Sequence, residues 1–220
     1  MDRQYDFKDR FDHENGFYLT ANLQRFSKLV THLDLFRRIG GLPGDIVECG
    51  VFKGASLSRF VKFRDLLENP FSRRVIGFDV FGAFPPAEYG PDIDVRARFV
   101  AAAGETGVSV EELTHYLEQS GVGQNVDLVA GDVRETIPAF LQQRPALRIA
   151  LLHIDVDLYE PTLCCLEALY PHVVRGGLVV LDDYGAFPGA NKAIEEFFAD
   201  KPIRFEKLPF SHAVTYVVKS

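Results

Sequence analysis

Short apolar runs rich in β-branched residues alternate with longer stretches of helical spacing along most of the chain. The expected strands lie at residues 46–47, 75–78, 126–129, 149–154 and 178–181, and the expected helices lie at 55–67, 137–143, 161–169 and 191–199. Strands that alternate with helices indicate βαβ units, which align the strands in parallel within one sheet. Two later runs, 203–205 and 213–218, have no crossover helix between them and predict an antiparallel hairpin at the sheet edge.

Two segments fall outside this alternation. Residues 22–39 have apolar side chains at helical spacing, so residues 1–40 are interpreted as an N-terminal arm and a helix that Asn22 caps. Residues 80–125 separate the second and third strands by far more than an ordinary connection, and we expect a lid insertion there, or else a surface excursion or a dimer contact. A capping box at Ser109-Val110-Glu111-Glu112 predicts a helix in its second half. The 220 residues are expected to form one domain, 1–220.

The net charge of the chain and its few cysteines limit which binding partners and which cellular compartment are expected. The 24 basic and 31 acidic residues give a net charge of −7 without a basic cluster, so neither nucleic acid nor a membrane is an expected partner. A cationic or neutral small ligand stays open. The first ten residues contain no apolar signal region, and the apolar runs fall far short of the ~20 residues that span a bilayer. Cys49, Cys164 and Cys165 are a poor disulfide framework, which predicts reduced thiols and a cytoplasmic protein.

Ligands of parallel sheets bind beyond the carboxyl ends of the strands, so the residues there indicate the chemistry. The first strand leads into Glu48-Cys49-Gly50-Val51-Phe52-Lys53-Gly54, whose glycines permit a tight turn but do not form G-x-G-x-x-G. Glu48 would repel a phosphate and suits a ligand with a positive group, as S-adenosylmethionine has. Asp79 after the second strand would accept its ribose hydroxyls. The alternative is a Rossmann-like turn for another nucleotide.

Four aspartates follow the fourth and fifth expected strands: Asp155, Asp157, Asp182 and Asp183. Residues two apart share a face of a strand, and neighbouring strands bring the two pairs together. Grouped carboxylates raise one another's pKa values and repel, a cost that a divalent cation removes. Oxygen ligands favour Mg²⁺, Ca²⁺ or Mn²⁺ over zinc. The alternative is that these aspartates cap the following helices, as Asp157 could ahead of Pro161.

Three segments together resemble the macrocin O-methyltransferase family. They are Leu42-Pro43-Gly44-Asp45-Ile46-Val47-Glu48-Cys49-Gly50-Val51, His153-Ile154-Asp155-Val156-Asp157-Leu158-Tyr159-Glu160-Pro161-Thr162, and Gly176-Gly177 with Asp182-Asp183-Tyr184-Gly185. The resemblance covers roughly residues 20 to 200. It implies a Rossmann-like class I methyltransferase fold with a mostly parallel seven-stranded sheet and helices on both faces. It also implies S-adenosylmethionine- and Mg²⁺-dependent methylation of a sugar or phenol hydroxyl. Asp132 stands where the family often has a large aromatic residue, which leaves the acceptor open.

The resemblance and the strand ends together assign the expected site. By resemblance, Asp155, Asp182 and Asp183 hold the metal and Asp157 is a candidate base; His212, in the loop before the last strand, is a second candidate. The expected cofactor contacts are Glu48, Gly50, Gly54, Ser56, Asp79, Gly131, Asp132 and Asp155. His153 lies within a strand, where a packed neutral ring is expected. Lys53 is expected to be solvated or to contact an anionic acceptor.

The expected reaction is an in-line methyl transfer from the cofactor to a hydroxyl of a sugar or another small natural-product or polysaccharide acceptor. Alignment and a metal that lowers the pKa of the acceptor hydroxyl would supply the rate. Two alternatives remain. A nucleotide-sugar or NAD-binding oxidoreductase would need the absent dinucleotide fingerprint, and a non-catalytic cofactor-binding protein would have no need of four strand-end aspartates. The helix at 22–39 and the long excursion could also form a homodimer.

Overall fold

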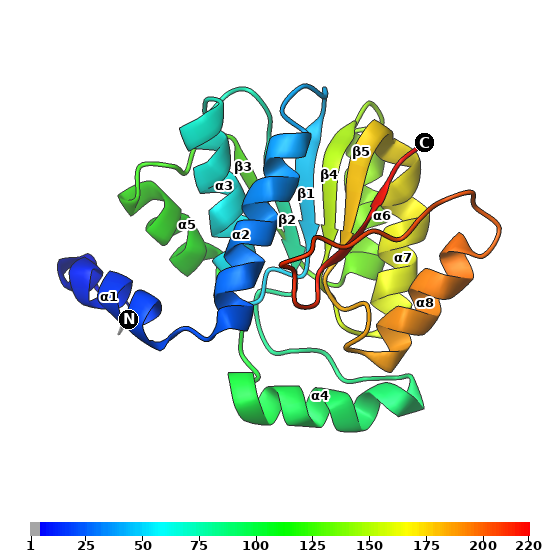
Figure 1. Cartoon of the computed structure of the whole chain (residues 1–220), viewed down its shortest axis with the longest axis horizontal. Helices are drawn as coiled ribbons and strands as arrows, with labels where there is room; N and C mark the ends of the chain where they lie inside the picture. The colour runs from blue at the N-terminus through cyan, green and yellow to red at the C-terminus, as the bar shows by residue number, and fades with distance from the viewer. Residues whose placement is uncertain (1–4) are drawn as a thin grey trace.

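The alternating pattern folds into a sheet of six strands within residues 5–220, the part of the chain that the computed structural model describes (Figure 1). The first four residues of the expected arm lie outside it. Across the sheet the strands are β3 (Val126–Ala130), β2 (Val75–Asp79), β1 (Asp45–Cys49), β4 (Ile149–Ile154), β5 (Val173–Leu181) and β6 (Thr215–Val218). Strands β1 to β5 run parallel, and β6 pairs antiparallel with β5.

The strand expected at 203–205 does not form, so the described sheet has six strands and the expected seven is wrong by one. Glu206 alone pairs with Tyr216, through an isolated antiparallel bridge whose two hydrogen bonds measure 2.8 Å. Ile203 and Phe205 pack their side chains onto the core instead, and the Phe205 ring stacks on Tyr184 with centroids 5.1 Å apart. Packing by these two side chains takes the place of a longer edge ladder.

Helices cover both faces of the sheet, as expected. One face packs against α6 (Val133–Gln143), α7 (Tyr159–Leu169) and α8 (Pro188–Phe198), and the other against α2 (Leu23–Arg38), α3 (Ala55–Leu67) and α5 (Val110–Gln119). Alternate side chains of β1 enter the two cores, with Val47 on the first face and Ile46 on the second. Each fully buried aliphatic side chain stabilises the fold by about 1.5–3 kcal/mol. The remaining helices are η1 (Phe7–Asp9), α1 (Arg10–Thr20), α4 (Gly90–Ala103) and η2 (Tyr170–His172).

Helix α2 confirms the expectation for residues 22–39. The Asn22 side chain accepts a hydrogen bond from the Arg25 amide at 3.0 Å and caps the helix. Gly40 and Gly41 follow its end, and Leu35 and Phe36 are buried against the sheet. Within residues 5–220 no helix combines the length and apolar character needed to cross a membrane.

The excursion between β2 and β3 contains two helices with different surroundings. Helix α5 is capped by Ser109, whose hydroxyl accepts from the Glu112 amide at 3.1 Å, and it buries Leu113 and Leu117 in the core. Helix α4 instead crosses beneath the carboxyl ends of the parallel strands (Figure 1). This position is the one a lid would take, and the role of α4 as a lid stays a prediction.

Candidate active site

The turn after β1 presses directly against the end of β4. Gly50 has a φ of 90°, and a Cβ atom there would lie 1.8 Å from the backbone oxygen of Asp155. The Asp155 amide donates to the Cys49 carbonyl oxygen at 2.8 Å. Only glycine permits so close an approach at this φ. The turn lies where the strand order reverses between β1 and β4, which is where open α/β sheets bind ligands.

Asp79 at the end of β2 holds this turn in place. Its Oδ2 accepts from the amides of Val51 and Phe52 at 2.8 and 2.9 Å, and its Oδ1 accepts from the Phe81 amide at 2.6 Å. The carboxylate therefore organises the glycine turn, and a contact with a ribose remains a prediction that would use its remaining lone pairs. Gly54, with a φ of 79°, immediately precedes α3 and packs against Leu113 of α5.

Gly131 and Asp132 lie at the next strand end, on the β2 side of the same rim. The Gly131 amide donates to the Asp79 carbonyl oxygen at 2.9 Å. The Asp132 side chain caps α6 by accepting from the Arg134 amide, and it also accepts from the Arg134 guanidinium at 2.7 Å. These hydrogen bonds lower the pKa of Asp132. Arg134 also binds Glu88 of the excursion at 2.8 Å, so Asp132 already has a firm structural partner.

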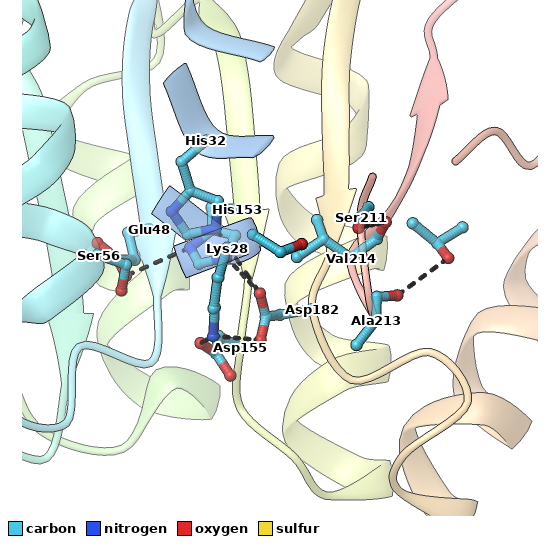
Figure 2. Close-up of polar contacts among 12 residues, drawn as sticks. Lys28, His32, Glu48, Ser56, His153, Asp155, Asp182, Ser211, Ala213 and Val214 are labelled. Carbon is cyan, nitrogen blue, oxygen red and sulfur yellow. Dashed lines mark hydrogen bonds and ion pairs between the residues drawn. The ribbon is translucent and has the colours of Figure 1, made fainter. Parts of the chain in front are cut away.

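A chain of buried polar side chains links α3, β1, β4 and the end of β5 (Figure 2). The Ser56 hydroxyl donates to Oε1 of Glu48, and Nδ1 of His153 lies 3.3 Å from the same oxygen. Nε2 of His153 lies 3.4 Å from Oδ1 of Asp182. Burial opposes charge on His153, but the hydrogen bonds with Asp182 and Glu48 outweigh it and raise its pKa to about 10. This shift favours the charged ring, while the packed, hydrogen-bonded position expected from the sequence is the one found.

Glu48 combines full burial with one unused oxygen. Burial raises the pKa of Glu48, although the hydrogen bonds from His153 and Ser56 act in the opposite direction. Its second oxygen, Oε2, is buried and has no hydrogen-bond partner among the described residues. A buried acceptor without a donor is costly, so this atom is suited to a donor supplied from outside the chain.

Lys28 of α2 reaches into the acidic end of β4 and β5 (Figure 2). Its ammonium lies 2.5 Å from Oδ2 of Asp182 and 3.3 Å from Oδ2 of Asp155. Burial opposes its charge, but attraction to Asp155 and Asp182 outweighs burial and raises the pKa of Lys28. Burial alone would raise the pKa of Asp182, whereas the Lys28 charge and the hydrogen bond from His153 hold it well below its usual range.

His32 lies one helical turn beyond Lys28 and is fully buried. Its ring stacks on Phe60 with centroids 5.1 Å apart and meets His153 edge-on at 5.0 Å. Nε2 of His32 lies 3.8 Å from Oδ1 of Asp182, and neither ring nitrogen has a hydrogen-bond partner in the described part of the chain. Burial lowers the pKa of His32 to about 3, which favours the neutral ring.

Three of the four expected aspartates form one tight cluster. Asp155, Asp157 and Asp183 each offer an oxygen, and these oxygens lie within 4.8 Å of one another. The Asp157 amide donates to Oδ2 of Asp183 at 2.9 Å, and Asp157 has a φ of 63°. Burial, together with the charge of Asp155, raises the pKa of Asp157, and burial with the charges of Asp157 and Asp155 raises that of Asp183. Asp182 faces Lys28 and the histidines instead, so Asp157 shares the cluster with Asp155 and Asp183.

His212 lies on the outer rim beside α2. Its backbone amide donates to Oγ of Ser27 at 3.2 Å, and that hydroxyl donates to the Phe210 carbonyl oxygen at 2.5 Å. The His212 side chain is exposed. The loop is closed by the Ser211 hydroxyl, which donates to the Val214 carbonyl oxygen at 2.9 Å. A role for His212 as a base stays a prediction.

Sequence reasoning missed Lys28 and His32. A usable signal is present, because residues four apart share a helix face, and this spacing aligns both residues with the buried face of α2 that includes Leu35. A lysine and a histidine on the apolar stripe of a helix point to a charged partner beneath it.

Comparison with known proteins relates the whole arrangement to one family. Residues 20–210 match the family model described as Macrocin-O-methyltransferase (TylF). An 8-demethyl-8-(2,3-dimethoxy-alpha-L-rhamnosyl)-tetracenomycin-C 4'-O-methyltransferase from Streptomyces olivaceus is 33% identical over 161 residues, 71% of this chain and 59% of the relative. Demethyldecarbamoylnovobiocin O-methyltransferase from Streptomyces niveus is 30% identical over 179 residues, 80% of this chain. The alignments thus span 59% and 66% of the lengths of these two relatives.

Solved structures agree with this assignment. The calicheamicin methyltransferase CalS11 superposes with a TM-score of 0.76 at 30% identity, over 99% of this chain and 87% of that chain. The O-methyltransferase NovP also gives a TM-score of 0.76, at 25% identity, over 88% of this chain and 80% of that chain. The fold is therefore the Rossmann-like methyltransferase fold expected from the sequence. With its glycine turn, its strand-end aspartates and a family match over residues 20–210, the chain belongs to the macrocin-O-methyltransferase family.

Proposed function

We propose that the chain is an S-adenosylmethionine-dependent O-methyltransferase that methylates a hydroxyl group of a small molecule, with a sugar as the acceptor class. The observation that carries the proposal is the close approach of the Gly50 turn to Asp155 beside the acidic cluster. The family membership supports the methyltransferase activity. The relative from Streptomyces olivaceus is named for O-methylation of a rhamnosyl-tetracenomycin, which supports a sugar hydroxyl as the acceptor.

The cofactor would lie along the turn after β1. The unpartnered Oε2 of Glu48 would receive a donor, and the ammonium group of the cofactor supplies one. Asp79 would bind the ribose. Ser56 holds Glu48 through its hydroxyl and acts by orienting that carboxylate. The turn glycines Gly50 and Gly54 would permit close approach, and the remaining expected contacts, Gly131, Asp132 and Asp155, line the same edge of the sheet.

The acidic cluster fits a divalent cation such as Mg²⁺. Asp155, Asp157 and Asp183 offer only oxygen atoms, and the raised pKa values of Asp157 and Asp183 reflect crowding that a cation relieves. Asp155, Asp182 and Asp183 stay the proposed ligand set, with Asp182 released from Lys28. When bound, the cation lowers the pKa of an acceptor hydroxyl and holds that hydroxyl in place.

Asp157 is the proposed base, and its position explains why. Its backbone conformation, with a φ of 63°, aims the residue out of strand geometry and toward Asp183. Its carboxylate lies within 4.8 Å of oxygens of Asp155 and Asp183, which places a proton acceptor beside the hydroxyl that these ligands would position. His212 is the alternative base. Helix α4 would exclude water from the reacting groups by covering the strand ends.

The proposed function is tested by calorimetric titration of S-adenosylhomocysteine in Mg²⁺ and then in EDTA. We expect one-to-one binding that EDTA leaves unchanged, because the cation serves the acceptor. Sugars and catechols are then screened as acceptors with radiolabelled S-adenosylmethionine, where Asp182→Ala should abolish metal-dependent methylation. Absence of binding in both buffers would overturn the proposal, and nicotinamide and nucleotide-sugar ligands would then test the oxidoreductase alternative. Cofactor binding without methylation of any acceptor would favour a non-catalytic binding protein.

A cytoplasmic location is part of the same proposal. Cys49, Cys164 and Cys165 are free thiols, as expected in a reducing compartment. A homodimer through α2 and the excursion remains a prediction, which the mass in solution would test.

A further inference from the structure

Lys28 is the one cation from α2 that reaches the acidic cluster in the described chain. Its ammonium contacts Asp182 at 2.5 Å and Asp155 at 3.3 Å, and only 22% of its side chain is exposed. Asp155 is shared, because it also belongs to the three-carboxylate cluster with Asp157 and Asp183. The ammonium therefore neutralises oxygens that the proposed cation would also need.

Two cations that use the same carboxylate oxygens oppose each other. Repulsion between an ammonium and a divalent ion a few ångström apart is strong where water is largely excluded. An oxygen of Asp155 or Asp182 that coordinates a metal is also withdrawn from its ion pair with Lys28. A bound metal ion and the Lys28 ammonium thus neutralise the same carboxylates, Asp155 and Asp182, and each is expected to exclude the other.

We propose that the Lys28 ammonium competes with the divalent metal for the carboxylates of Asp155 and Asp182. Metal binding would then weaken the attachment of the N-terminal half of α2 to the sheet. This inference rests on the proposed function, since it concerns the same metal site. It adds a residue that sets metal affinity and links the site to a helix outside the strand ends.

The coupling follows from how α2 is attached. Residues 23–26 of its first turn are exposed, whereas burial begins at Thr31 and His32. Between these parts, the polar attachments of α2 are the Lys28 ion pairs and the hydrogen bonds of Ser27 to the 210–212 loop. If a metal displaces Lys28, Ser27 is the remaining polar attachment of the N-terminal half of α2. Because such coupling is reciprocal, docking of this half through Lys28 should in turn weaken metal binding.

Manganese binding to the apoprotein tests the competition without any turnover. Mn²⁺ accepts the same oxygen ligands and is titrated by calorimetry or by its paramagnetic resonance signal. We expect Lys28→Met to bind Mn²⁺ at least about tenfold more tightly than the unchanged protein. Lys28→Arg, which keeps the charge, should stay close to the unchanged protein. Lys62→Met, which removes an exposed charge on α3, is the matched control and should not change the affinity.

Hydrogen exchange tests the coupling to α2. In the unchanged protein, saturating Mn²⁺ should speed amide exchange in residues 26–31, whereas Lys28→Met should exchange quickly with or without the metal. Lys28→Gln replaces the methionine variant if the latter fails to fold. Equal or weaker Mn²⁺ binding by the neutral variants, or no binding by any variant, would overturn the inference. Failure of the proposed function would instead appear as absent S-adenosylhomocysteine binding, so the two outcomes are distinguishable.

Discussion

The carboxylate of Asp92 occupies the space that a methyl group on Gly189 would need. Oδ1 of Asp92 accepts from the Gly189 amide at 2.7 Å, and Oδ2 accepts from the Tyr159 amide at 3.2 Å. A Cβ atom at position 189 would lie 1.9 Å from Oδ2. Asp92 is fully buried and thus joins α4 to the amino-terminal ends of α7 and α8, where a negative charge is favourable.

Gly189→Ala should detach α4 from α8. The added methyl group displaces the Asp92 carboxylate, and we expect a loss of about 1–3 kcal/mol in the free energy of unfolding. Amide exchange in residues 90–103 should increase more than exchange elsewhere. Gly90→Ala is the matched control, because a Cβ there meets nothing within 4 Å. Unchanged exchange in α4 of the Gly189 variant would contradict the attachment.

Gly50→Ala should disrupt the turn that joins β1 to the site. The residue combines a φ of 90° with a would-be Cβ contact of 1.8 Å to backbone that cannot move aside. We expect a loss of at least about 3 kcal/mol by urea unfolding, from backbone strain and overpacking together. Gly41→Ala, where a Cβ meets nothing within 4 Å, should change stability little. Comparable stabilities for both variants would show that the β1 and β4 ends separate easily.

Arg64→Met should destabilise the edge of the sheet at β3. Arg64 is fully buried on α3 and donates to the carbonyl oxygens of Asn125 at 3.0 Å and Gln124 at 2.7 Å. The substitution removes the Arg64 donor from both carbonyl oxygens, although that of Asn125 keeps a hydrogen bond from the Val75 amide at 3.1 Å. We expect a loss of about 1–3 kcal/mol in unfolding experiments. Arg98→Met, at an exposed position of α4, should cost far less. Equal losses for the two variants would contradict a structural role for Arg64.

Glu68 should make stability depend on pH through its pairing with Arg73. The Arg73 guanidinium donates to both Glu68 oxygens at 2.8 Å. Burial alone would raise the pKa of Glu68, but the hydrogen bonds from Arg73 and Ser72 lower it below 4.5. A lowered folded-state pKa contributes stability above the unfolded-state pKa, and that stability is lost as pH falls through the folded-state value.

The measurement compares urea unfolding of the unchanged protein and Glu68→Gln at pH 7 and at successively lower pH. The difference in stability should be largest at pH 7, about 1–2 kcal/mol for a partly exposed charged pair, and should shrink below pH 4.5. A difference that stays constant across this range would mean that the carboxyl group acts through packing and not through its charge.

Much of the fold could be predicted because its signals are local. Apolar period, the Asn22 cap and the Ser109 cap each depend on neighbours within a few residues, and each is found as expected. Of the expected capping box, the bond from the Glu112 amide to Ser109 forms, while the Glu112 side chain accepts from the Tyr116 hydroxyl. The run at 203–205 has the same local signal, yet its side chains pack onto the core next to Tyr184 without joining the ladder. Whether such a segment pairs with the edge strand or packs its side chains on the core depends on tertiary contacts. The sequence of the segment alone therefore does not decide between the two.

The site was predictable only in part for a similar reason. The strand ends locate the aspartates in the sequence. The clustering of Asp155, Asp157 and Asp183, however, depends on a φ of 63° at Asp157, a conformation that is uncommon for a non-glycine residue and cannot be predicted from its identity. Asp182 pairs with Lys28 of helix α2, which lies 154 residues away in the sequence. Such a contact depends on how α2 packs against the sheet, which periodicity alone does not determine.

The first part of the excursion between β2 and β3 is closed at its base, where residues 82–84 pair with residues 105–107. Ala83 pairs with Thr106, the Phe84 amide donates to the Glu105 carbonyl oxygen at 2.8 Å, and the Gly107 amide donates to that of Gly82 at 2.9 Å. Because the ends already meet, doubling the length between them costs only about 0.6 kcal/mol in loop-closure entropy. A change of length within residues 84–105 should therefore cost little, provided that it keeps this paired base, the Asp92 contact with Gly189 and the packing of Phe99 on Phe187.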